Sequence, residues 1–62
     1  AALRDALDAL PQKLRTVTML HYMEGYDVSE LSRLLHIPKG TVTSRLHMAR
    51  GRLREILKED IE

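Results

Sequence analysis

The chain has 62 residues, a formal net charge of +1 and no cysteine. Its length suffices for one small domain, and the missing thiols exclude disulfide bridges and cysteine-based zinc sites. No apolar run approaches the roughly 20 residues that cross a membrane, and nothing resembles a signal peptide. We therefore expect one soluble, cytoplasmic domain over residues 1–62. Because it begins with alanine rather than methionine, we expect it to be a fragment of a longer chain.

Only helices are predicted, because leucine recurs at helical spacing and no alternation with a period of two persists. The first helix covers about residues 2–9. Its apolar residues share one stripe: Leu3, Ala6, Leu7 and Leu10. Pro11 then ends this helix or begins the next, since proline suits a first helical turn and disrupts an interior.

The second helix is predicted from about Pro11 to Met23. Its buried side consists of Leu14, Val17, Leu20 and His21. Gly25 supplies the stop, because glycine readily adopts the positive φ that commonly follows a helix C-terminus.

The third helix has the clearest start in the chain. Asp27 is a good N-cap, and Glu30 stands three residues later, which is the spacing of a capping box. We expect a buried stripe of Leu31, Leu34 and Leu35. The helix ends near His36, because Pro38 disfavours helical backbone in the residue before it. Histidine is among the few non-glycine residues that tolerate positive φ, so we expect a left-handed His36.

The fourth helix begins near Pro38 or Lys39 and runs to about Leu57. Its apolar residues form one continuous seam: Val42, Leu46, Ala49, Leu53 and Ile56. The opposite side carries Thr43, Ser44, His47, Met48, Arg50, Gly51 and Arg54. The closing stretch EILKEDIE puts acids at a helix C-terminus, where the helix dipole disfavours them, so we expect fraying there.

The small net charge conceals a polarised chain. From Leu31 to Arg54 there are six basic residues and no acidic one, a charge of +6. The rest of the chain carries −5. Solvated helix faces usually mix the two signs for pairing, so unmixed positive charge indicates an anionic partner.

A short turn between two amphipathic helices, the second one basic outside, is the pattern of a helix-turn-helix. We therefore expect a compact, all-α, four-helix domain with a helix-turn-helix over about residues 27–57. Ser32 is small where the helices cross, and Ile37 can fill the corner between them. Pro38 and Gly40 open the second motif helix and leave its first amides free for a DNA phosphate. Its exposed N-terminal turns can then enter a major groove.

The segment IPKGTVTSRLHMARGRL resembles the end of region 4 of bacterial sigma factors, especially the extracytoplasmic-function (ECF) group. The earlier segment ALDALPQKLRTVTMLHYMEGYDVSELSRLL resembles the part of region 4 that precedes it, so the resemblance covers nearly the whole chain. It implies a domain that recognises the promoter −35 element while attached to RNA polymerase. The flap of the polymerase β subunit is the implied protein contact, and an anti-sigma factor is a further expected partner.

The resemblance also assigns roles to single positions. The base-facing positions are Thr43, Ser44, His47 and Met48. The phosphate-facing positions are Lys39, Thr41, Arg45 and Arg50, with Arg15 from the second helix. Thr43 replaces a common lysine or arginine, and Met48 replaces an arginine. Both changes remove a charge, so the base preference cannot be inherited from relatives and electrostatic anchoring should be weaker than in a typical member.

Two other binding classes stay open. The effector domain of a two-component or quorum-sensing (LuxR-type) regulator has similar helices, although the Gly40–Thr41 step and SRLHMARGRL favour a sigma factor. The third reading is a protein-interaction domain captured by an anti-sigma factor. Met19, Tyr22 and Met23 are most simply core or boundary residues, but methionines at an exposed edge also suit an adaptable protein-binding patch.

An enzyme is excluded by the absence of a glycine-rich phosphate loop and of any paired nucleophile and base, and a helical domain this small has no room for a deep pocket. We expect no cofactor. The three histidines, His21, His36 and His47, stand 15 and 11 residues apart, which is not the spacing of a helical zinc pair. We therefore expect no metal site either.

Overall fold

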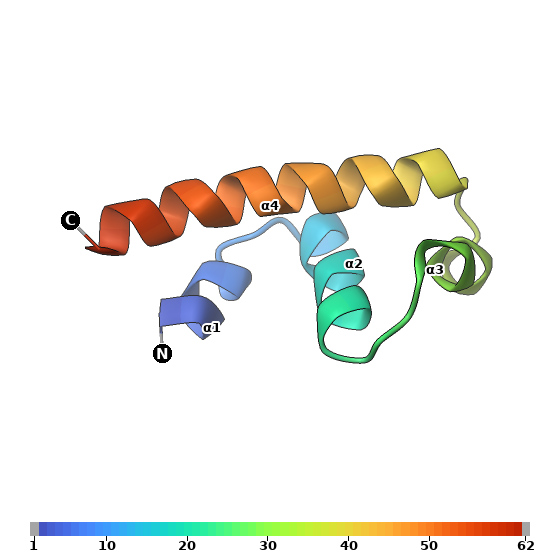
Figure 1. Ribbon diagram of the computed structural model, residues 1–62, viewed down its shortest axis with the longest axis horizontal. Helices are drawn as coiled ribbons and strands as arrows, with labels where there is room; N and C mark the ends of the chain where they lie inside the picture. The colour runs from blue at the N-terminus through green and yellow to red at the C-terminus, as the bar shows by residue number, and fades with distance from the viewer. Residues whose placement is uncertain (1, 62) are drawn as a thin grey trace.

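The computed structural model describes residues 2–61, with side chains through residue 58. The chain forms four helices: α1 (Ala2–Asp8), α2 (Gln12–Tyr22), α3 (Val28–Leu35) and α4 (Lys39–Ile61). The described part of the chain contains no strand, so the all-α prediction is confirmed. α4 is the longest element, and α1, α2 and α3 follow one another along one side of it (Figure 1).

The predicted stripe of α1 is buried except at its first member. Ala6, Leu7 and Leu10 are at most 6% exposed, whereas Leu3 is 53% exposed. Leu3 is the exposed member of the stripe because it lies a turn before Leu7, at the outer end of a helix only seven residues long. Pro11 precedes α2 as its N-cap with φ −55° and ψ 148°, so proline begins the second helix.

The core side of α2 holds Leu14 and Val17, as predicted, with Leu20 half-buried. Thr18 is also buried, which the apolar pattern did not indicate. Its hydroxyl donates to the Leu14 carbonyl at 2.7 Å, which satisfies the polar group inside the fold. Gly25 has φ 84°, so the predicted stop uses the left-handed backbone that glycine accepts without strain.

α3 confirms the capping box and corrects one core assignment. The Asp27 amide donates to Glu30 Oε1 at 2.9 Å, and the Glu30 amide donates to Asp27 Oδ1 at 2.8 Å. Leu31 is fully buried and Leu35 is half-buried, but Leu34 is 50% exposed. The prediction for Leu34 is wrong because the side of α3 that packs on α2 and α4 passes through Val28, Leu31 and Leu35.

The seam of α4 serves two hydrophobic clusters. The first combines Leu7, Leu10 and Leu14 with Ala49, and Leu53 packs against it. The second combines Val17, Leu31, Val42 and Leu46, with Leu20, Val28, Leu35 and Ile37 packed around it. The predicted seam is confirmed, because its first three residues are buried and Leu53 and Ile56 are half-buried.

The predicted end of α4 near Leu57 is four residues too early, since the helix continues to Ile61. No glycine or proline interrupts this stretch, and its residues are mostly good helix formers. The predicted effect of the terminal acids concerns Glu59, Asp60 and Glu62, whose side chains lie outside the described residues.

Candidate nucleic-acid interface

The turn between α3 and α4 is fixed by local hydrogen bonds. His36 has φ 57° and ψ 44°, so the expected left-handed residue is confirmed, and its amide donates to the Ser32 carbonyl. The Ile37 amide donates to the same carbonyl at 3.1 Å, while Ser32 Oγ donates back to the Ile37 carbonyl at 2.5 Å. Ile37 also packs against the second cluster, so the direction in which α4 leaves the turn is set by both polar and apolar contacts.

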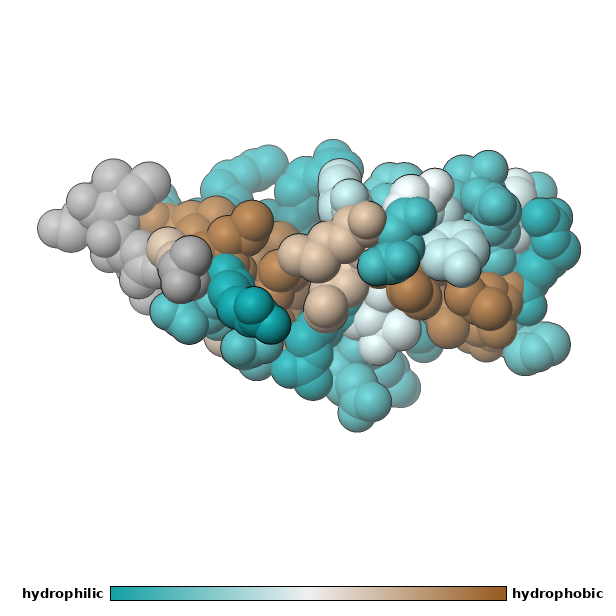
Figure 2. Space-filling view, turned by 90° about the horizontal axis from the view of Figure 1, so that it is seen from below, coloured by the Kyte–Doolittle hydropathy of each residue, from teal (hydrophilic) through white to brown (hydrophobic). Residues whose placement is uncertain are grey.

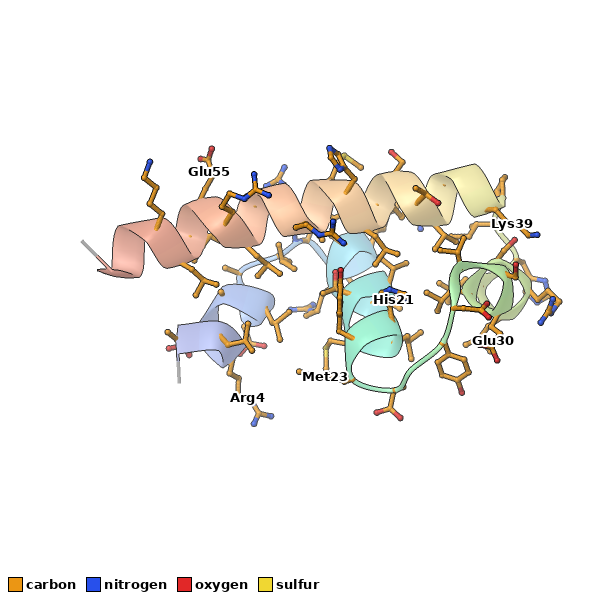
Figure 3. The ribbon with its side chains drawn as sticks, viewed as in Figure 1. Arg4, His21, Met23, Glu30, Lys39 and Glu55 are labelled. Carbon is orange, nitrogen blue, oxygen red and sulfur yellow. The ribbon has the colours of Figure 1, made fainter. Side chains whose placement is uncertain are left out.

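The first turn of α4 is closed by backbone hydrogen bonds to Pro38. The Thr41 and Val42 amides donate to the Pro38 carbonyl at 3.0 and 3.2 Å. The amides of Lys39 and Gly40 precede this first hydrogen-bonded turn, and both residues are exposed. Lys39 lies at the end of the molecule (Figure 3). A Cβ built on Gly40 would meet nothing within 4 Å. The helix end is therefore open to an approaching anion.

The four residues predicted to face bases lie together on the exposed side of α4. Val42 and Leu46 are buried, at 0% and 7% exposure, whereas Thr43, Ser44, His47 and Met48 are all exposed. The expectation about which side of α4 is hidden is thus confirmed. Contact with bases stays a prediction.

Arg45, one of the predicted phosphate-facing residues, has a neighbour that the sequence did not indicate. Arg45 is half-buried and lines a depression with Ile37 and three residues near the start of α2, which are Gln12, Lys13 and Thr16. Lys13 therefore lies near Arg45 of α4, although the sequence analysis did not single it out. Lys13 is one basic residue outside the acid-free segment 31–54, so the clustering of charge in the sequence does not point to it.

Two of the predicted phosphate-facing arginines also make hydrogen bonds inside the domain. Arg15 Nη1 donates to the Asp8 carbonyl at 3.2 Å, which joins the start of α2 to the end of α1. Arg50 Nη2 donates to Tyr22 Oη at 2.6 Å, which joins α4 to the end of α2. A guanidinium has five N–H donors, so each arginine keeps others for a second acceptor.

His21 lies at the edge of the interface and is half-buried. Its Nδ1 is 2.7 Å from the Tyr26 carbonyl, so this nitrogen carries the hydrogen and donates it. The ring lies on the side of α2 nearer α3, beneath α4 (Figure 3). It lines a depression with Thr43, His47 and Arg50, so His21 borders the exposed side of α4.

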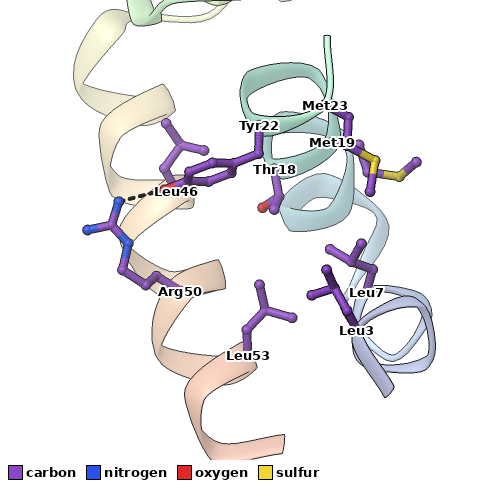
Figure 4. A pocket seen from close by; sticks show the side chains of 9 residues that line it. All are labelled: Leu3, Leu7, Thr18, Met19, Tyr22, Met23, Leu46, Arg50 and Leu53. Carbon is purple, nitrogen blue, oxygen red and sulfur yellow. Dashed lines mark hydrogen bonds between the residues drawn. The ribbon is translucent and has the colours of Figure 1, made fainter. Parts of the chain in front are cut away.

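A separate apolar groove, of about 380 Å³, opens between α1, α2 and α4. Its lining, drawn in Figure 4, is Leu3, Leu7, Thr18, Met19, Tyr22, Met23, Leu46, Arg50 and Leu53. Met19, Tyr22 and Met23 are 39%, 57% and 57% exposed, so they lie at the boundary of the fold rather than inside it. Seen from below, hydrophobic residues are exposed over α1 and α2 and again toward the α3 end of the molecule (Figure 2).

Other kinds of site find little support in the described part of the chain. Among those residues, no three histidine, cysteine, aspartate or glutamate side chains come close enough to hold a metal ion. None of the helices over residues 2–61 combines the length and hydropathy needed to cross a membrane. The apolar groove and the exposed side of α4 with Thr43, Ser44, His47 and Met48 are the two surfaces considered below.

Comparison with known proteins identifies the family that the chain resembles. Residues 1–53 match the family model described as sigma-70, region 4. The ECF RNA polymerase sigma factor SigW of Bacillus subtilis is 42% identical over 50 residues, which are 81% of this chain and 27% of that protein. SigE of Mycolicibacterium smegmatis is 40% identical over 57 residues, which are 92% of this chain and 22% of that protein. The chain thus spans about a quarter of the length of these relatives.

Proposed function

This chain belongs to the sigma-70 region 4 family, in its ECF group, and from that membership we propose that it is a DNA-binding part of an alternative sigma factor in transcription initiation. The single observation that carries the proposal is the pairing of the two sides of α4: Val42 and Leu46 are buried while Thr43 and Ser44 are exposed. A helix seated in this way can enter a major groove without losing its core contacts.

Family membership also decides between the two DNA-binding classes that the sequence left open. The match extends over residues 1–53, and the similar proteins bear the name of sigma factor. An effector domain of a two-component or quorum-sensing regulator is therefore no longer an alternative. A domain that binds only proteins remains an outcome that the DNA titration below can reveal.

The proposed DNA target is the promoter −35 element, read through the major groove. Thr43, Ser44 and His47 offer short or ring donors and acceptors to base edges, and Met48 offers an apolar contact. The proposed phosphate contacts come from Lys39, Thr41, Arg45, Arg50 and Arg15. Such contacts fix the position of a protein on the duplex without reading its sequence. The open first turn of α4 supports this arrangement, since its amides favour an anion.

The proposed protein contact is the flap of the RNA polymerase β subunit, which would seat apolar side chains in the apolar groove. Three features support the groove as the docking surface. It is lined mainly by apolar side chains, it includes two methionines that adapt to a partner's shape, and its outermost members, such as Leu3 and Met23, are more than half exposed. An anti-sigma factor is proposed as a second partner of this chain.

The DNA-binding proposal is tested with duplexes selected from a randomised pool by polymerase core and the intact parent chain. Binding of the 62-residue chain to a selected and a scrambled duplex is then measured by fluorescence anisotropy at low salt. Arg45→Ala should weaken both complexes and lower the slope of affinity against salt by about one unit, because one phosphate contact is lost. Ser44→Ala should change the preference at one or two base pairs.

The two variants serve as controls for each other, because one removes a charge and the other removes only a hydroxyl. If both left the affinity, the salt slope and the base preference unchanged, the assignment of α4 as the recognition helix would be wrong. Binding to polymerase without measurable DNA affinity would identify a protein-interaction domain instead.

A further inference from the structure

One side-chain hydrogen bond joins helices that are distant in the sequence. Arg50 Nη2 donates to Tyr22 Oη at 2.6 Å, across a separation of 28 residues (Figure 4). The other side-chain hydrogen bonds of the described residues join positions seven or fewer apart. The pair therefore ties the C-terminal end of α2 to the middle of α4, independently of the hydrophobic clusters.

Arg50 borders both candidate surfaces. It lines the apolar groove together with Tyr22, and it lines the depression that contains Thr43 and His47. Thr43, His47 and Arg50 stand four and three residues apart, so they follow one edge of α4. The guanidinium is thus placed where the recognition side of α4 meets the groove.

Tyr22 is itself held in place by its neighbours. Its ring contacts the His21 ring edge to face, with 4.7 Å between the ring centroids. His21 in turn bonds to the Tyr26 carbonyl at 2.7 Å, beyond the end of α2. The hydroxyl that accepts from Arg50 therefore has a defined position, although the ring is 57% exposed. An exposed arginine without such an acceptor would sample many rotamers, and binding a phosphate would have to restrict them.

We propose that Tyr22 is a positioning residue for DNA binding: its hydroxyl holds the Arg50 guanidinium at the edge of α4, with further N–H groups directed to a duplex phosphate. The planar guanidinium can bind a hydroxyl and a phosphate at the same time, because it presents five donors in fixed directions. The inference rests on the proposed function and assigns to it a residue outside the recognition helix.

Tyr22→Phe tests the proposal, because it removes the hydroxyl and keeps the ring. A phosphate contact does not depend on sequence, so the probe is a random-sequence duplex of about 20 base pairs, titrated by anisotropy at several low salt concentrations. The matched control is Tyr26→Phe, since Tyr26 uses its backbone carbonyl rather than its hydroxyl toward His21 and does not line the groove. Circular dichroism checks that each variant keeps its helices.

Tyr22→Phe should weaken binding about threefold, the effect of one exposed hydrogen bond, and make the salt dependence shallower. Tyr26→Phe should leave both quantities unchanged. In an Arg50→Ala background, Tyr22→Phe should not weaken binding further. If Tyr22 acted only on the structure of the domain, the loss of affinity would be the same with and without Arg50. Arg50→Lys serves as a second variant should Tyr22→Phe disturb the fold, and it should also lose about threefold because the bridging fork is gone.

Three results would overturn the inference: no loss of affinity, an equal loss in both Arg50 backgrounds, or tighter binding, which would mean that the tyrosine keeps the arginine away from DNA. Lys39→Ala and Arg45→Ala separate this failure from that of the proposed function. If they weaken binding while Tyr22→Phe does not, only the positioning role fails. If they too have no effect, the DNA-binding proposal fails as well.

Discussion

The two ends of α4 differ in how their apolar neighbours are covered. At its N-terminal end, α3 and the turn form a closed structure with a capping box, a left-handed His36 and paired bonds between Ser32 and Ile37. Around its middle and C-terminal half, α1 and α2 leave the apolar groove open, and Leu3 and Met23 are more than half exposed. Both ends leave one leucine about half exposed, Leu3 at 53% and Leu34 at 50%, but Leu3 lines an apolar groove and Leu34 does not.

The packing of α3 at the N-terminal end of α4 should contribute more to stability than the packing of α1 beside the groove. Two matched leucine-to-alanine substitutions test this expectation. Leu31 is fully buried in the second cluster, whereas Leu7 is 6% exposed and also lines the groove. Leu31→Ala should lower the free energy of unfolding by about 3 kcal/mol, through lost burial and the cavity left behind. Leu7→Ala should lower it by less, because its site is already open on one side.

Urea unfolding followed by circular dichroism measures both changes, and equal slopes against urea would show that the two variants unfold to the same extent. A small domain has little stability in reserve, so Leu31→Ala should unfold at a clearly lower urea concentration than the unchanged chain. The comparison would be contradicted if Leu7→Ala proved the more damaging of the two.

Polar substitutions in the groove test whether its exposed side chains contribute to partner binding and not to stability. Leu3→Ser and Met23→Ser replace exposed apolar side chains of the groove. Each should change the free energy of unfolding by no more than about 0.5 kcal/mol, as is usual for surface positions. Each should weaken binding to a fragment carrying the polymerase β flap by about tenfold, since a partner would bury the side chain.

Calorimetric titration with the flap fragment checks this prediction, and Leu34→Ser is the matched control. Leu34 is an equally exposed leucine, at 50%, but it lies on α3 outside the groove. The docking assignment would be wrong if Leu34→Ser weakened flap binding while Leu3→Ser and Met23→Ser left it intact.

Sequence reasoning succeeded where the signal was local. Asp27 and Glu30 are three residues apart, so their capping box follows from spacing alone. His36 precedes an X–Pro step by one residue, and few side chains other than histidine tolerate its left-handed backbone. The seam of α4 repeats over several turns, so its buried side was readable without knowing what covers it.

It failed where the answer depends on a partner element distant in the sequence. Periodicity places Leu3 and Leu34 on the apolar side of their helices, but only packing decides whether another helix reaches that far. Thr18 can be buried because its hydroxyl donates to the Leu14 carbonyl one turn earlier. A pattern of apolar residues does not predict such a bond. The bond between Tyr22 and Arg50 crosses 28 residues and has no counterpart in local spacing.

The candidate site residues also fall into those whose exposure follows from the helical pattern and those whose contacts depend on packing. Exposure of Thr43, Ser44, His47 and Met48 follows from the α4 seam and is confirmed, while their contact with bases stays a prediction. The internal hydrogen bonds of Arg15 and Arg50, and the position of Lys13 beside Arg45, became visible only once the helices were packed.

The most direct test of the division between a DNA-binding side and a docking groove is a titration of the isotope-labelled chain with its selected duplex, followed by amide chemical shifts. The account predicts that the largest changes fall on residues 39–48, at the start of α4, and that the amides of Leu3, Met19 and Met23 in the groove hardly move. Changes concentrated on those groove amides, with the start of α4 unaffected, would contradict it.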